Sequence, residues 1–208
     1  WFADSSNSVD ITSNDIISFA QSSSIGFDSA SITVEASGTD ANASFDVGFA
    51  AGSVSILSVT ADGTNSSARA NVSGDITITD SLNLSGSNGG SASFNLGPND
   101  SYDVGPAFDS ASATVTASDS GNAFLRMDDV SGSVSDFTVE ATGVSDEVGA
   151  VMSVNGTLTI TGNISVSAGT EASALMNLSA GVSHDTYEVY WGNWFDQGTT
   201  YTLHVMGE

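Results

Sequence analysis

Cysteine and lysine are both absent from this 208-residue chain, and its only two cations are Arg69 and Arg126. Without cysteine there is no disulfide framework, no thiolate metal site and no thiol nucleophile. Two cations against 25 Asp and Glu give a formal charge of −23 at pH 7. This balance excludes nucleic acid as a partner, because phosphate contacts need Lys and Arg.

Long apolar runs are also lacking. None approaches the ~18 residues that a membrane span needs, so we predict no membrane span. The chain begins at Trp1 rather than Met and carries no basic, apolar leader. We therefore expect a mature exported protein, secreted or held at the extracellular cell surface.

Apolar residues alternate with polar ones along most of the chain. Ile32, Val34 and Ala36 form one such set, and Leu57, Val59 and Ala61 form another. A spacing of two places each set on one face of a β-strand. Turn-forming residues interrupt the runs at short, regular intervals, and no stretch has helical periodicity. The pattern predicts an all-β fold of antiparallel sheets packed as a β-sandwich, either jelly-roll or immunoglobulin-like.

An internal repeat divides the chain. The segments 27–37 (FDSASITVEAS) and 108–118 (FDSASATVTAS) are identical at nine of eleven positions, and 52–63 and 132–143 at seven of twelve. Further matches follow in the same order at nearly the same offset. We predict two tandem β modules of about 80 residues, at 26–105 and 106–208, packed closely because the link between them is short. Whether they form one fused sandwich or two is left open.

The segment 1–25 precedes the repeat and matches nothing in it. Val9 and Ile11, and then Ile17 and Phe19, alternate as in strands. We predict an N-terminal extension that adds strands to a sheet, with these four side chains as anchors. The receiving sheet belongs either to the same chain or to a neighbouring subunit, which would make the segment a donor strand.

Signals for chemistry are weak. His184 and His204 lie in no metal-binding spacing, and no G-x-S-x-G motif is present, so we predict no catalytic residue and no enzyme. Asp128 and Asp129 offer adjacent carboxylates that either hold a structural Ca²⁺ or Na⁺ or simply cap a turn. No other cofactor is predicted.

Two further sets of residues are candidates for contacts with partners. The aromatic residues Tyr190, Trp191, Trp194 and Phe195 either pack in the core, form a subunit interface or stack on glycans. Eight Asn-x-Ser/Thr sequons indicate either covalent glycans on a surface protein or a Ser- and Asn-rich composition. They are Asn42, Asn65, Asn71, Asn83, Asn99, Asn155, Asn163 and Asn177.

The opening Trp1-Phe2-Ala3-Asp4 resembles the Phe-x-Asp start of TasA-type biofilm fibres and archaeal bundling pili. The resemblance covers this short opening, together with the general pattern of a cysteine-free, β-rich chain with an N-terminal extension. It implies a jelly-roll subunit whose N-terminal strand completes the next subunit. The absence of lysine and the strength of the internal repeat depart from that family.

Together these observations predict a structural subunit of an extracellular filament, pilus or surface assembly. It would be an acidic glycoprotein homopolymer of the biofilm type, joined by strand donation from its N-terminal segment. The alternative is a carbohydrate- or Ca²⁺-dependent adhesin module that uses the aromatic residues near the C-terminus.

Overall fold

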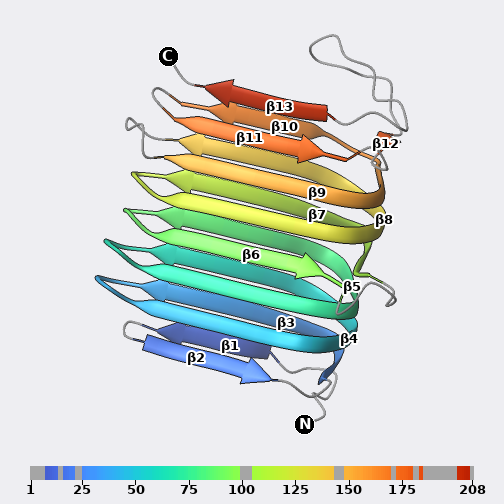
Figure 1. Ribbon diagram of the computed structural model, residues 1–208, viewed down its shortest axis with the longest axis horizontal. Coiled ribbons are helices and arrows are strands. Elements are labelled where there is room, and N and C mark those ends of the chain that lie inside the picture. The colour runs from blue at the N-terminus through green and yellow to red at the C-terminus, as the bar shows by residue number, and fades with distance from the viewer. Residues whose placement is uncertain are drawn as a thin grey trace.

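The computed structural model describes residues 8–13, 16–21, 25–98, 105–142, 148–169, 172–179, 183–184 and 201–206. Within these ranges the chain forms thirteen strands and no helix (Figure 1). The strands are β1 (Ser8–Ser13), β2 (Ile16–Gln21), β3 (Ile25–Ser37), β4 (Asn42–Asp62), β5 (Ser67–Ser87), β6 (Ser91–Gly97), β7 (Ala107–Ser118), β8 (Asn122–Thr142), β9 (Gly149–Ile160), β10 (Ile164–Ala168), β11 (Ser173–Leu178), β12 (Ser183–His184) and β13 (Tyr201–Met206).

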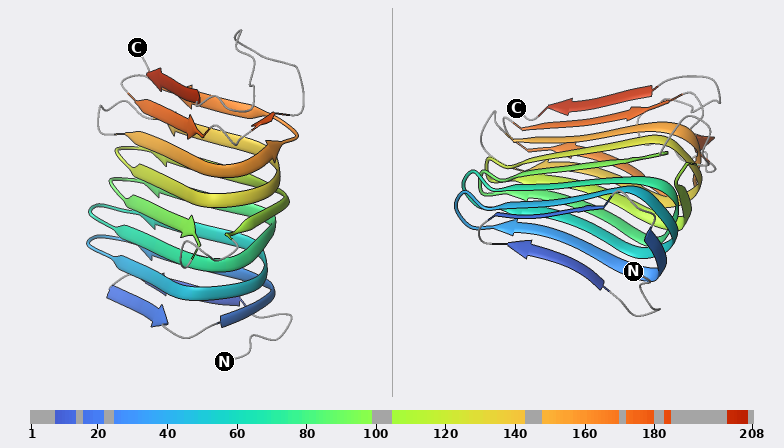
Figure 2. Two further views of the ribbon diagram at one scale, coloured as in Figure 1. Left: turned by 45° about the vertical axis from the view of Figure 1, so that its right-hand side comes forward. Right: turned by 60° about the horizontal axis from the view of Figure 1, so that its bottom comes forward.

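The strands wind into a β-solenoid of about six turns. Successive coils stack with tight turns along one side and a rounded bend along the other (Figures 1 and 2). Every described strand pair is parallel except β11 with β13. The predicted antiparallel β-sandwich, jelly-roll or immunoglobulin-like, is therefore wrong, although the all-β class is right. Alternation shows which side chains are buried but not the direction of the neighbouring strand.

Each coil contributes one strand segment to each of two flat faces. Face A contains β2, β6 and β11, together with 42–47 of β4, 67–73 of β5, 122–127 of β8 and 149–154 of β9. Face B contains β1 and β10, together with 30–37 of β3, 56–62 of β4, 81–87 of β5, 112–118 of β7 and 137–142 of β8. The long strands β4, β5 and β8 pass from face A around the bend into face B.

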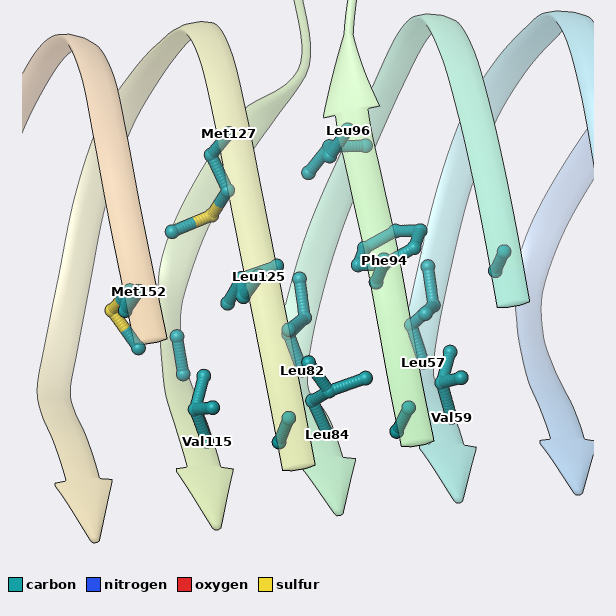
Figure 3. Close-up of a cluster of buried hydrophobic side chains, with 14 of the residues drawn as sticks. Leu57, Val59, Leu82, Leu84, Phe94, Leu96, Val115, Leu125, Met127 and Met152 are labelled. Carbon is teal, nitrogen blue, oxygen red and sulfur yellow. The ribbon is translucent and has the colours of Figure 1, made fainter. Parts of the chain in front are cut away.

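The core lies between the two faces, and it is built from columns of inward side chains that repeat from coil to coil. Figure 3 shows Phe94, Leu125 and Met152 of face A opposite Leu82 and Val115 of face B. The column that contains Leu82 has 0% exposure from Ile32 through Phe137. Apolar burial at this scale is the main stabilising contribution of such a fold.

Small residues line the core beside the tight turns. On face A this column holds alanine in six successive strand segments: Ala43, Ala68, Ala92, Ala123, Ala150 and Ala174. On face B the corresponding column is Ala36, Ala61, Gly86, Ala117, Ala141 and Ala168. At the tight turns the chain crosses directly from one face to the other, so the space between the faces accepts only small side chains.

The long sequence repeat is a repeat of three coils. Ile32, Leu57, Leu82 and Ala113 follow one another in a single column, and Ile32 and Ala113 occupy equivalent places in the two matching segments. The repeated FDSAS sequence forms the same irregular corner twice. Ser29 and Ser110 have φ of 53° and 59°, and their amides donate to Ser53 Oγ at 2.8 Å and Ser133 Oγ at 3.2 Å. The described parts of 26–105 and 106–208 thus supply consecutive coils of one 13-stranded sheet.

Candidate functional site

The first coil contains the four residues predicted to anchor an N-terminal strand. β1 pairs with β3 and β2 pairs with β4, so in this structure the segment adds to its own chain. Val9 and Ile11 occupy the columns of Ile32 and Val34, while Ile17 and Phe19 occupy those of Ala43 and Phe45. All four therefore stand at inward positions, at the N-terminal end of the stack.

Burial of these four residues is incomplete. Ile11 is buried, Val9 and Phe19 are partly buried against the core, and Ile17 is 40% exposed. The Phe19 ring stacks on that of Phe45, with centroids 5.3 Å apart. Ile17 ends the alanine column of face A, where every other member is a much smaller side chain. The N-terminal end thus presents apolar side chains that continue the core.

The C-terminal end differs between the two faces. On face A, β13 pairs antiparallel with β11 and takes its outer edge. On face B, β10 pairs with β8, and no other described strand pairs with it. Its inward residues Ile164, Val166 and Ala168 are only partly buried. Five described apolar residues pack against the core but remain partly exposed. All five lie in the first coil or in β10, which are the two ends of the stack of coils.

The predicted cation site is not assembled among the described residues. Asp128 accepts a hydrogen bond from Arg126 Nε at 2.6 Å, and the neighbouring Asp129 sits in the left-handed region with φ of 51°. This is the geometry of a bend with an ion pair at the surface. No group of three or more potential metal ligands occurs in the described part of the chain.

The carboxylate of Asp62, which the sequence offers as a possible cation ligand, lies at the tight-turn side. Asp62 Oδ1 accepts hydrogen bonds from Asn88 Nδ2 at 2.6 Å and Ser87 Oγ at 2.8 Å, both on the next coil. These bonds lower the pKa of Asp62, with Asn88 the larger cause. The turns also bond directly to each other, because Gly63 N–H donates to the Ser87 carbonyl. Asp62 therefore joins successive coils through hydrogen bonds.

The predicted glycosylation sites fall into two groups. Asn42, Asn65, Asn155 and Asn163 are exposed. Asn71, Asn83 and Asn177 are half-buried within strands, and Asn71 Oδ1 accepts a hydrogen bond from Asn95 Nδ2 at 2.8 Å. Asn99 lies outside the described residues, as do Tyr190, Trp191, Trp194 and Phe195. The geometry thus adds nothing to the adhesin alternative, which depends on those aromatic residues.

An outward apolar stripe on face A was not predicted. Phe124, Val151 and Leu175 share one register position on three successive coils, and Phe124 is 43% exposed. Each of them is flanked by inward core residues, so simple alternation gives no separate signal for the stripe.

Comparison with known proteins found no matching family model, no similar curated protein and no similar solved structure. The described part of the chain contains no helix that is long and apolar enough to cross a membrane.

Proposed function

We propose that this protein is a structural subunit of an extracellular filament or surface assembly, and that it polymerises end to end through its N-terminal coil. The observation that carries the proposal is the state of that coil. β1 and β2 each pair on one side only among the described strands, and three of their four inward apolar residues, Val9, Ile17 and Phe19, are incompletely covered. A solenoid whose end strands have no further partner among the described strands, over partly exposed core residues, is suited to receive another copy.

The composition of the edges supports the proposal. Soluble β proteins commonly protect an open edge with charged residues or proline. Here β2 (IISFAQ) and β10 (ISVSA) contain no charged residue and no proline, in a chain with 25 acidic residues. In β1 (SVDITS), Asp10 is the only charged residue, and there is no proline. These edges therefore lack the usual protection against pairing with another chain.

Faces A and B, the sides of the solenoid, have the opposite character. Carboxylates such as Asp46 on face A and Glu35 and Glu140 on face B point outward, and the two arginines both lie on face A. Like-charged sides repel each other within a Debye length, about 8–10 Å at physiological salt. Contact through the ends, where Asp10 is the one charged residue of β1, β2 and β10, is thereby favoured over side-by-side packing. Because the two ends differ, the contact is heterologous and does not close, which produces a filament.

The extracellular location rests on the eight sequons of the sequence and on the exposure of four of their asparagines. Asn42, Asn65 and Asn155 lie on a strand end, a turn and a bend, where glycans would cover the sides of the solenoid, whereas Asn163 directly precedes β10 at its C-terminal end.

The test is electron microscopy and sedimentation of the purified chain beside two variants with matched changes. Ile17→Asp places a charge at the open end, and Phe124→Asp places one at a similarly exposed site on the side. We expect filaments from the wild type and from Phe124→Asp, and monomers from Ile17→Asp. Added NaCl should strengthen assembly by screening the charge of −23. Monodisperse wild-type monomers at every salt concentration would refute the proposal.

A further inference from the structure

We propose that the outer edge of β10, with which no described strand pairs, is the acceptor for β1 of a second copy, so that face B continues without interruption from one subunit to the next. This inference rests on the proposed end-to-end assembly and specifies its contact. The occupant is a second copy of this chain. Among the described strands, β10 has a partner on one side only at the C-terminal end and β1 has a partner on one side only at the N-terminal end, so the two ends of the same chain can pair with each other.

The columns of the core give the register. Val9 and Ile164 are the first and last members of one column, which passes through Ile32, Leu57, Leu82, Ala113 and Phe137. Ile11 and Val166 end the neighbouring column in the same way. Val9, Ile164 and Val166 are partly buried, whereas the members between the two ends are fully buried. Placing β1 on β10 sets Val9 on Ile164 and Ile11 on Val166.

The direction of the strands agrees with this register. All described strand pairs in face B are parallel, so a second copy translated along the rod presents β1 parallel to β10. The junction then has the same hydrogen-bond pattern as each coil-to-coil contact within the chain. It is an extension of an interface that the fold already makes.

Face A cannot continue in the same way, because β13 already occupies the outer edge of β11 in the antiparallel direction. A neighbour's β2 would meet β13 rather than β11. The asymmetry explains why we assign the contact to face B and not to both faces. At the junction, face B is then one continuous parallel sheet, whereas face A ends in the antiparallel strand β13.

The absence of cysteine allows a direct test by cross-linking. In the proposed register Asp10 of one copy lies beside Ser165 of the next, and both are exposed. Neighbouring parallel strands are ~4.8 Å apart, which is within the Cα separation that a disulfide spans. Within one chain the same two positions are separated by six strand steps, about 29 Å, so an internal disulfide is impossible.

The double variant Asp10→Cys/Ser165→Cys should give, on mild oxidation, a ladder of covalent multimers that a thiol reduces to monomer. The control is Asp10→Cys/Ser167→Cys, which shifts one cysteine two positions onward, about 6.6 Å along the strand. Its cysteines would be ~8 Å apart and should form no ladder. Each single variant can form dimers at most, which shows that multimers need both ends.

Two outcomes would overturn this inference: filaments that give no disulfide ladder, or a shifted control that gives an equal ladder. In either case the proposed end-to-end assembly would have to use a different contact. No end-to-end association of the wild type would overturn both.

Discussion

Substituting Gly132 by alanine should be among the most damaging single changes in this solenoid. Gly132 has φ of +98°, and a Cβ there would lie 2.1 Å from the carbonyl oxygen of Phe108 on the preceding coil. A non-glycine residue in this backbone region costs about 1–3 kcal/mol. Phe108 is the register partner of Gly132 in the parallel pairing of β7 and β8, so moving its carbonyl away disturbs that pairing at a further cost of ~1–2 kcal/mol. We expect a loss of about 3–4 kcal/mol in the free energy of unfolding.

Three other glycines separate the two causes. Gly38 has φ of +104° with nothing within 4 Å of a Cβ, so Gly38→Ala tests the backbone conformation alone. Gly86 has no such φ, but its Cβ would meet Asn122 O at 2.0 Å, so Gly86→Ala tests the contact alone. Gly48 has neither feature, and Gly48→Ala should stabilise by about 0.4–1 kcal/mol.

Urea denaturation of the monomeric protein measures all four variants. For a chain of this size a loss of about 3–4 kcal/mol corresponds to a fall of roughly 10 °C in Tm. The order of stability should be Gly48→Ala above wild type, then Gly38→Ala, with Gly132→Ala lowest. If Gly132→Ala is no less stable than Gly38→Ala, the coils separate easily at this corner. The close approach of the Phe108 carbonyl would then contribute nothing to the loss of stability.

Two further predictions concern the core and the turns. Phe94→Ala removes a fully buried ring from the middle of face A and should lower the free energy of unfolding by about 3–5 kcal/mol. The outward Phe124→Ala should cause a negligible loss, as measured by urea denaturation. Equal losses from the two variants would contradict the assignment of inward and outward side chains. Asp62→Asn should destabilise the protein at pH 7, because the pKa of Asp62 is lower in the folded chain than its unfolded value of 3.8. The ionised carboxylate therefore stabilises the fold above pH 3.8, and this contribution is lost as the pH falls through the folded-state pKa. The deficit should therefore shrink as the pH falls below 3.8. The exposed Asp109→Asn controls for the general relief of negative charge, and a deficit independent of pH would count against the hydrogen bonds to Asn88 and Ser87.

The strand content is predictable from the sequence, whereas the architecture is not. Alternation in sets such as Ile32, Val34 and Ala36 correctly marks the inward residues, because burial on one side has the same signature in any sheet. The pairing direction depends on which distant strand comes next, and no local pattern contains that information. One polar face is typical of antiparallel sheets, so the pattern favours antiparallel pairing. In a solenoid the parallel strands also have one face in water.

The period of a single coil is hidden by the longer repeat. The column that contains Leu82 runs through Ile32, Leu57, Leu82, Ala113, Phe137 and Ile164, so the step from one coil to the next varies. Its members share apolar character rather than identity. Exact matches such as FDSAS recur only every third coil, so their spacing suggests a module where the structure has three coils. The regular series Ala43, Ala68 and Ala92, each after a Gly-, Asn- or Ser-rich turn, is the available signal for the shorter period.

The candidate site shows the same division between local and non-local information. Val9, Ile11, Ile17 and Phe19 can be named from alternation alone, and the structure places all four at inward positions of the first coil. Their counterparts in β10 alternate just as clearly, yet nothing local distinguishes them from the inward residues of any other strand. That they lie at an end follows only from the order in which the coils stack.

The distribution of charge connects the fold to the proposed assembly. A parallel solenoid turns its repeated outward positions into long sides and leaves two ends with unpaired strand edges. In this chain the outward positions hold carboxylates such as Glu35, Asp46 and Glu140, while β2 and β10 have no charge. Elongation brings edge strands with a single charged residue, Asp10, and half-buried apolar residues together, whereas side-by-side packing brings many like charges together. A net charge of −23 therefore opposes bundling more than it opposes elongation, and the same sequence that keeps the sides apart leaves the ends free to join.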